Sequence, residues 1–270
     1  MKSLKPITRS PLRIYLGKKY YRCKRYLEWY VGIKKYAAAK QNTLLPYTIF
    51  KHQTPLLREL KDVDMWLQHN KINNLIIASQ TLNKLVVKPG ETFSYWRLIG
   101  NTTRRKGYMD GMILFYGKVT TGVGGGLCQL SNLIYWMTLH SPLTITERYR
   151  HSYDVFRDSN RSQPFGSGAT CAYNYLDLQI KNETSHNYQL VIYFTDTHLV
   201  GEWKADTSPA QTYDIYEKEH WITHEYWGGY VRHNRIYRKV YNMEHELIDD
   251  EIITENHAIM MYEPMLQEGI

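Results

Sequence analysis

The chain has 270 residues, of which 43% are hydrophobic and 22% are charged. This length is enough for one large domain or two modest ones with a real core, and the composition is that of an ordinary globular protein. The net charge of +8 favours an anionic partner, such as an anionic membrane surface or an acidic cell-wall polymer. No nucleic-acid-binding motif accompanies this charge, so nucleic acid is not expected as a partner.

The cysteines and the apolar segments bear on the compartment. Cys23, Cys128 and Cys171 form no Cys-x-x-Cys pair, and three cysteines leave at least one free in a monomer. No stretch approaches the roughly 20 apolar residues that a membrane span needs. The basic first thirty residues lack the apolar core and the cleavage site of a secretion signal. We therefore expect a cytoplasmic protein, or one bound peripherally to the inner face of the membrane.

Residues 1–84 are predicted to form an N-terminal helical region. Residues 11–40 carry a stripe of Leu, Tyr, Val and Ile among lysines and arginines, which indicates a basic amphipathic helix. Such a helix can lie on an anionic membrane surface or pack against the body of the protein. Residues 44–50 indicate a linker or a short strand. A second helix is predicted to open at Thr54-Pro55, to be interrupted at residues 70–74 and to continue towards Leu82.

The pattern changes at residue 85. Residues 85–96 combine short apolar runs with a turn, and helical periodicity returns over residues 128–140. Residues 143–149, 173–180, 188–194 and 212–262 are typical of strands. We therefore predict an α+β fold. N-terminal helices are followed, over residues 85–270, by a mixed body with a glycine-rich loop, one central helix and mostly antiparallel strands.

Cys128 is the first candidate for chemistry. It follows Gly124, Gly125 and Gly126 and stands where the central helix is predicted to begin. Glycines adopt backbone angles closed to other residues and let another chain approach closely. A cysteine at a helix N-terminus faces unpaired N–H groups and the positive end of the dipole, which favours the nucleophilic thiolate. The same N–H groups would also suit an oxyanion hole. The alternative to a nucleophile is that Cys128 is a buried structural cysteine beside a tight turn.

A nucleophilic cysteine needs a base, and His151 is the best-placed histidine. It follows a predicted strand that a short connection through Pro142 joins to the central helix, so the two side chains could meet. The alternative is a structural histidine. His220 and His224 are four residues apart, as metal ligands on a helix would be, but the residues around them look like strand. No metal site is therefore predicted.

Four blocks of sequence resemble the VanW-like family in their order and spacing. These blocks are residues 88–94 (KPGETFS), residues 110–111 (DG), residues 124–135 (GGGLCQLSNLIY) and residues 147–152 (ERYRHS). The strongest match spans residues 85–182, and the flanks look like those of the short, single-domain form found with vancomycin-resistance operons. The resemblance implies a bacterial cell-envelope protein associated with glycopeptide resistance.

The resemblance also implies a chemistry. VanW-type domains in larger cell-wall proteins are linked with peptidoglycan and with L,D-transpeptidase activity, an acyl transfer through a cysteine thioester. On this sequence Cys128 would be the nucleophile and His151 the base, and no metal or organic cofactor would be needed. The substrate-binding residues implied by the same blocks are Ser94, Gly124, Gly125, Gly126, Gln129, Ser131, Glu147, Arg148 and Ser152.

The chain departs from longer relatives in one respect that bears on this chemistry. Where many of them have an Asp after the His block, this sequence has Gly168. If that Asp orients the histidine, the orienter here must come from elsewhere, and Asp154 and Asp177 are candidates. Cross-linking also takes place outside the membrane, although no export signal is visible.

Two functions therefore stay open. The first is a cysteine-dependent acyl transferase acting on peptidoglycan-type peptides. The second is a non-catalytic protein that binds a cell-wall peptide or precursor in a glycine-rich, tyrosine-lined groove, with Cys128 as a small packed residue.

Overall fold

The computed structural model describes residues 4–7, 9–57, 64–155 and 163–264. It confirms the α+β prediction, with one central helix among mostly antiparallel strands. The helices are α1 (Pro11–Tyr30), α2 (Met65–Leu82), α3 (Tyr95–Ile99) and α4 (Cys128–Leu139), with a 3-10 turn at Arg104–Lys106. The strands are β1 (Tyr47–Pro55), β2 (Leu85–Val87), β3 (Thr92–Ser94), β4 (Asp110–Phe115), β5 (Lys118–Val123), β6 (Thr144–Glu147), β7 (Tyr153–Asp154), β8 (Gln179–Lys181), β9 (Tyr188–Phe194), β10 (His198–Ala205), β11 (Gln211–His224), β12 (Tyr230–Asn242) and β13 (Leu247–Met260).

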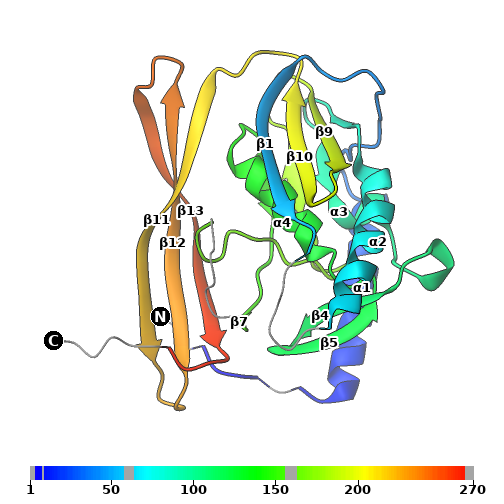
Figure 1. The fold of residues 1–270 in the computed structure, drawn as a ribbon, viewed down its shortest axis with the longest axis vertical. Helices are drawn as coiled ribbons and strands as arrows, with labels where there is room; N and C mark the ends of the chain where they lie inside the picture. The colour runs from blue at the N-terminus through cyan, green and yellow to red at the C-terminus, as the bar shows by residue number, and fades with distance from the viewer. Residues whose placement is uncertain (1–3, 8, 58–63, 156–162, 265–270) are drawn as a thin grey trace.

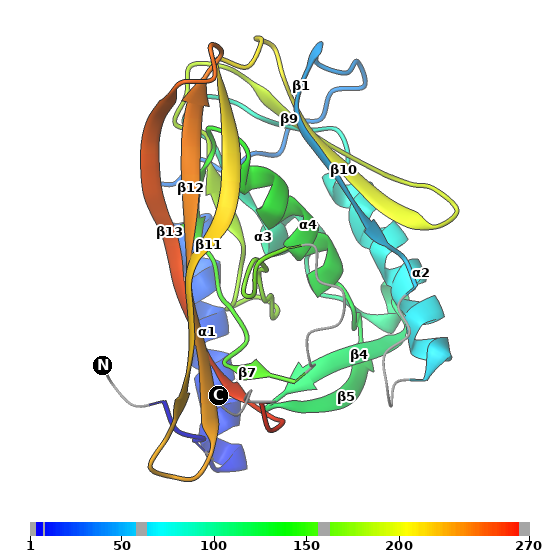
Figure 2. The ribbon, with the colours of Figure 1, turned by 60° about the vertical axis from the view of Figure 1, so that its left-hand side comes forward.

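Two sheets enclose the central helix α4. One is antiparallel with the order β1-β10-β9-β2, and the other has the order β11-β12-β13-β7, in which only the short β7 runs parallel to its neighbour. Helix α4 lies between these sheets (Figures 1 and 2). The smaller sheet β3-β8-β6 and the hairpin β4-β5 complete the body. The predicted strands of the C-terminal tail are confirmed as the three long strands β11, β12 and β13.

Helix α4 is buried because its sequence is apolar on nearly every side. Nine of its twelve residues are buried, including Leu130, Leu133 and Met137. Polar contacts join its C-terminal end to both sheets. The indole N–H of Trp203 on β10 donates to the hydroxyl of Thr138, at 3.1 Å. Arg238 of β12 donates to the carbonyl of Leu139 at the C-terminal end of the helix, at 3.2 Å.

The predicted start of the second helix is wrong. Thr54 and Pro55 end strand β1, where they pair with Leu199 and His198 of β10. Helix α2 begins at Met65, and residues 58–63 lie outside the described part of the chain. The interruption predicted at residues 70–74 is also absent, since α2 runs unbroken to Leu82. The region 1–84 thus contributes an edge strand to the body, while its boundary as a domain remains a prediction.

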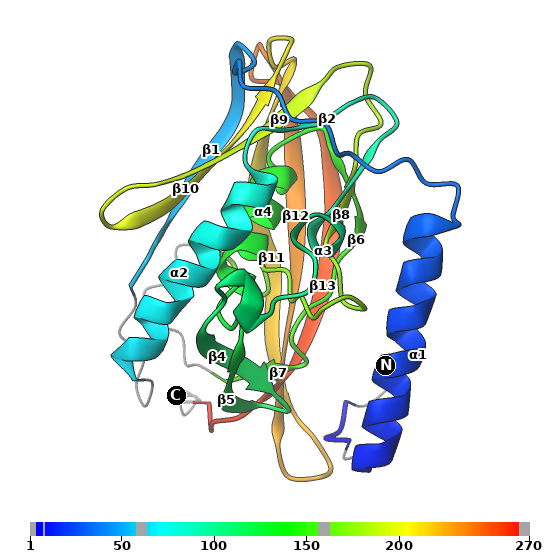
Figure 3. The same ribbon diagram turned by 90° about the vertical axis from the view of Figure 1, so that its right-hand side faces the viewer.

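Helix α1 is shorter than predicted. It ends at Tyr30 rather than near residue 40, because Gly32 follows and the next segment finds partners in the body. Ala37 donates to the carbonyl of Thr92 at 2.9 Å, and Lys40 forms a bridge with Leu85. Figure 3 shows α1 at the edge of the molecule, with this extended segment crossing to β1.

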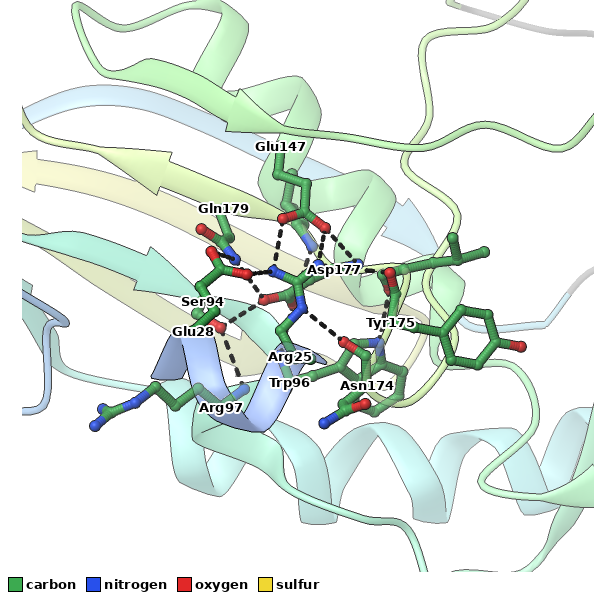
Figure 4. A network of polar contacts seen from close by, with 12 residues as sticks. Arg25, Glu28, Ser94, Trp96, Arg97, Glu147, Asn174, Tyr175, Asp177 and Gln179 are labelled. Atoms are coloured by element: carbon green, nitrogen blue, oxygen red, sulfur yellow. Dashed lines mark hydrogen bonds and ion pairs between the residues drawn. The ribbon is translucent and has the colours of Figure 1, made fainter. Parts of the chain in front are cut away.

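A buried ion-pair network fixes α1 to the body (Figure 4). The guanidinium of Arg25, whose side chain is only 7% exposed, donates to both carboxylate oxygens of Glu147 on β6. It also donates to Glu28, at 2.6 Å, and to the carbonyl of Asn174, at 3.1 Å. Burial raises and hydrogen bonding with Lys34 lowers the pKa of Glu28, with the net result that the pKa is below its ordinary value. This network and the buried ring of Trp29 determine where α1 lies.

Candidate functional site

A cavity of about 1190 Å³ opens beside the N-terminal end of α4. Its walls come from segments far apart in the sequence: α1, the hairpin β4-β5, the glycine loop at residues 124–126, and residues 149–153 and 170–176. The predicted site residues that line it are Gly124, Gly125, Gly126, Cys128, Gln129, His151 and Ser152.

The glycine loop needs its glycines for two different reasons. Gly124 and Gly126 have φ values of +78° and +88°, in the region that side chains disfavour. Gly125 instead lies against the backbone of Gly111, so that an added Cβ would stand 2.2 Å from its carbonyl carbon. The amide of the buried Asn74 on α2 then ties the loop down, donating to the carbonyl of Gly125 at 3.0 Å. The loop is thereby held at one position beside the cavity.

This loop delivers Cys128 as the first residue of α4. Its side chain is half-buried, and the sulfur lies 4.0 Å from the carbonyl oxygen of Cys171. The N–H groups of Gln129 and Leu130 are used within the turn, since they donate to the carbonyls of Gly126 and Leu127, both at 3.1 Å. Among the described residues, no group accepts a hydrogen bond from the N–H of Cys128 itself. The N–H of the preceding Leu127 has no acceptor among the described residues either, so two N–H groups at the helix start are not used within the turn.

Burial raises the pKa of the Cys128 thiol above its ordinary value. This direction is opposite to the one expected from the helix N-terminus. The reason is that removal of the charged form from water outweighs the hydrogen bonds with the backbone of Cys171 and of Cys128 itself, which lower the pKa. Burial, and secondly the charge of Arg150, lower the pKa of His151. At neutral pH the site therefore holds a thiol and a neutral imidazole, not a thiolate and an imidazolium.

Tertiary contacts bring His151 and Cys128 to the same cavity. The segment at residues 168–172 lies beside α4, where Ala169 donates to the side chain of Asn132 at 2.8 Å. The neighbouring N–H of Thr170 donates to the carbonyl of Tyr149, also at 2.8 Å, which brings the His151 segment alongside. Within the described residues, no hydrogen bond joins the imidazole to the thiol. Both groups face one ligand space without contacting each other.

Two predicted serines lie outside the described lining and support the walls. Ser94 caps α3 and donates to the carboxylate of Asp177 at 2.5 Å. Ser131 is fully buried and donates to the carbonyl of Ala169 at 2.7 Å. Because these hydroxyls are engaged within the protein, they position the walls of the cavity.

Glu147 and Arg148 also lie outside this lining. Glu147 is the partner of Arg25 in the network that fixes α1. Arg148 donates to the carbonyl of Gly168 at 2.8 Å, and its guanidinium lies 4.9 Å from the centre of the Tyr135 ring. The two charged residues implied by the resemblance as substrate-binding are thus used for internal contacts here.

Neither of the two candidate orienters, Asp154 and Asp177, forms a hydrogen bond with His151 among the described residues, and position 168 carries no acid. An added Cβ at Gly168 would lie 2.7 Å from the side-chain oxygen of Asn132, so a side chain at that position would need Asn132 to move. Asp154 accepts from Arg232 and from Tyr262, at 3.5 Å and 2.8 Å. Asp177 accepts from Ser94 and from the backbone of Trp96, at 2.9 Å. Burial raises the pKa of Asp177 to about 7.

The sequence reasoning missed Cys171 and Asn74 as parts of the site. Cys171 lines the cavity beside Cys128, and burial raises the pKa of its thiol well above the ordinary value. Its position depends on a contact across 43 residues, for which the sequence offers no local signal. Asn74 was not predicted to contact the site, because the asparagines of residues 70–74 favour a break in the helix.

The remaining histidine pair does not line this cavity. His220 and His224 both belong to β11, where four residues span roughly 13 Å, too far for both to bind one ion. Across the described ranges, no group of three or more His, Cys, Asp or Glu side chains is arranged to hold a metal ion. No helix in these ranges combines the length and the apolar character that crossing a membrane requires.

The fold and the site define an α+β protein in which a glycine loop brings a cysteine to the wall of a cavity. The chain belongs to the VanW-like family: the family model described as VanW like protein matches residues 70–204. The vancomycin B-type resistance protein VanW of Enterococcus faecalis is 36% identical over 232 residues, which cover 84% of this chain and 82% of that protein. The uncharacterized protein YoaR of Bacillus subtilis is 32% identical over 117 residues, covering 42% of this chain and 36% of YoaR. No solved structure matches.

Proposed function

We propose that the protein is associated with vancomycin resistance and binds a peptidoglycan-type peptide or precursor in the cavity beside Cys128. The observation that carries this proposal is the convergence of the glycine loop, Cys128 and His151 on one cavity large enough for a peptide. Similarity to the enterococcal VanW protein over most of both chains supports the connection with resistance. Binding at an anionic membrane surface through α1 remains a prediction.

Acyl transfer is the second candidate. It is favoured by the protonation states of the two groups, which are a thiol at Cys128 and a neutral imidazole at His151. A neutral imidazole can accept a proton, and a thiol has one to give. When a bound peptide brings the two groups together, the thiol proton passes to His151 as sulfur attacks the carbonyl carbon. The C–N bond then breaks, the imidazolium returns its proton to the leaving amine, and a thioester remains. An acceptor amine or water attacks this thioester, and its proton leaves through the imidazole as the thiol is restored.

Incubation with a defined muropeptide separates the two candidates. Intact-protein mass spectrometry should show a covalent acyl adduct on the wild-type protein if acyl transfer occurs, and none on Cys128→Ser. The matched control is Cys23→Ser, which removes an exposed thiol outside the cavity and should keep the adduct. Binding measured by calorimetry without any adduct would exclude acyl transfer. Absence of both binding and adduct would overturn the proposed function.

The pH dependence of alkylation tests the state of the thiol itself. Because burial raises the pKa of Cys128, modification by iodoacetamide should be slow at pH 7. Its rate should rise with pH through a midpoint above the roughly 8.5 of a free thiol. In the absence of peptide, His151→Ala should leave this midpoint unchanged, since no hydrogen bond joins the two groups. A midpoint below 8.5 that rises in the variant would contradict the protonation states described above.

A further inference from the structure

The charged residues in the lining of the cavity are all of one sign. The basic side chains that line it are Arg9, Arg13, Lys18, Lys71 and Arg150. Among the described lining residues there is no Asp and no Glu. Such a lining gives the cavity a positive potential, and because Arg9, Arg13 and Lys18 are solvent-exposed, their charges are screened by salt.

Three of these basic residues come from the N-terminal segment and α1. On the helix, Arg13, Ile14, Gly17, Lys18 and Tyr21 recur at the spacing of one helical face, and this face forms the cavity wall. The ammonium of Lys18 lies 5.4 Å from the ring of Phe115 on β4, which places it over the opposite wall. Helix α1 therefore closes one side of the cavity with cations.

Nothing in the described part of α1 neutralises these charges. Its single acid is Glu28, which is already paired with Arg25 and with Lys34, at 2.6 Å each. Within the described residues, Arg9, Arg13 and Lys18 form no ion pair. Their charges thus remain available to an incoming group, whereas Lys71 already donates to Gln68 at 2.7 Å.

We infer that the cavity takes an oxyanion-bearing ligand, with its carboxylate or phosphate at the α1 wall and an acyl part extending towards Cys128. This inference rests on the proposed function and narrows its substrate class. Guanidinium and ammonium groups bind such anions through charge-assisted hydrogen bonds, and the Arg13 fork is matched to two oxygens. A peptide without an anionic group would leave this wall without a partner.

Calorimetric titration with three probes tests the inference. The probes are a muropeptide with a free C-terminal carboxylate, the same muropeptide as its C-terminal amide, and inorganic diphosphate as a competitor. The acid should bind more tightly than the amide, and its affinity should fall as sodium chloride is raised. If diphosphate displaces the acidic muropeptide at concentrations that leave binding of the amide unaffected, phosphate is the better anion for this wall. If diphosphate does not displace the acidic muropeptide, the carboxylate is the preferred anion.

The double variant Arg13→Gln/Lys18→Gln should bind the acidic muropeptide roughly fivefold to tenfold more weakly. Glutamine keeps the helix propensity of the replaced residues, and circular dichroism will verify that α1 remains folded. The control is Lys24→Gln, which removes one positive charge from α1 at a position outside the cavity lining and should leave binding unchanged.

The outcomes separate this inference from the proposed function. Equal binding of the acid and the amide, with no effect of the double variant, would overturn the anionic ligand and leave peptide binding intact. Failure of both muropeptides to bind would overturn the proposed function, and diphosphate binding by the same protein would then show an anion site that serves another ligand. If the double variant and Lys24→Gln lose the same affinity for the acidic muropeptide, the effect is one of net charge. This result would overturn the assignment of the anionic group to the α1 wall.

Discussion

Replacement of Arg25 by Met should destabilise the protein by roughly 3–5 kcal/mol, the usual range when one partner of a buried ion pair is removed. The structure supports a value in this range, because the side chains of Arg25 and Glu147 are only 7% and 17% exposed. Without the guanidinium, the Glu147 carboxylate stays buried beside Asp177, whose backbone N–H already donates to it at 3.3 Å. Methionine fills a similar volume, so the loss reports the charge more than a cavity.

Urea denaturation followed by tryptophan fluorescence will measure this change. The control is Lys24→Met, which alters an exposed residue of the same helix and should change the free energy of unfolding by no more than about 0.5 kcal/mol. The double variant Arg25→Met/Glu147→Met should recover much of the loss, since it leaves no unpaired charge behind. A loss below about 1 kcal/mol for Arg25→Met, or additive losses in the double variant, would refute the account of a coupled, buried network.

Two further predictions concern Asp177 and Gly125. The pKa of Asp177 is about 7 in the folded protein and ordinary in the unfolded chain, so its contribution to stability is full below about pH 4 and is lost as pH rises through 7. Melting temperatures at pH 5 and pH 8 should therefore differ less in Asp177→Asn than in the wild type, and an unchanged difference would contradict the raised pKa. Gly125→Ala should destabilise by about 1–3 kcal/mol, because its Cβ would stand 2.2 Å from the Gly111 backbone. Thermal unfolding will compare it with Gly17→Ala, which meets nothing within 4 Å and should be neutral or slightly stabilising.

The sequence was sufficient for the fold class and for the central helix because both are encoded locally. Apolar residues at helical spacing predicted α4, and the pattern of apolar residues predicted β9 and the strands of the C-terminal tail. The strand predicted over residues 173–180 is wrong for residues 173–178, since β8 begins only at Gln179. The glycines and the helical periodicity that follows them placed Cys128 at the start of the helix, where the structure also has it. For Cys128 and His151 the sequence predicted only that the two side chains could meet. Both line one cavity, but no hydrogen bond joins them, because their relative placement depends on how three separate segments meet.

Helix α2 illustrates why local signals failed elsewhere. Asparagines at residues 70–74 favour turns in isolation, yet here their side-chain amides bind the carbonyls of neighbouring loops instead of their own backbone. Asn70 donates to Asp110 and Asn73 to Gly107, both at 2.9 Å, and Asn74 bonds Met109 in both directions. Hydrogen bonds to distant loops, which the local sequence cannot predict, thus keep the helix continuous through residues 70–74.

The pairing of β1 with β10 has a consequence for synthesis on the ribosome. Strand β1 ends at Pro55, whereas β10 ends at Ala205, so 205 − 55 = 150 further residues must be made before the pairing is complete. At about 5–20 residues per second, this interval lasts roughly 8–30 s. During that time β1 has an unsatisfied edge, and the polar run Lys51-His52-Gln53-Thr54 makes it a poor template for aggregation. The pairing of β1 with β10 is thus the most non-local one in its sheet. The polar residues of β1 limit aggregation of this strand until β10 has been made.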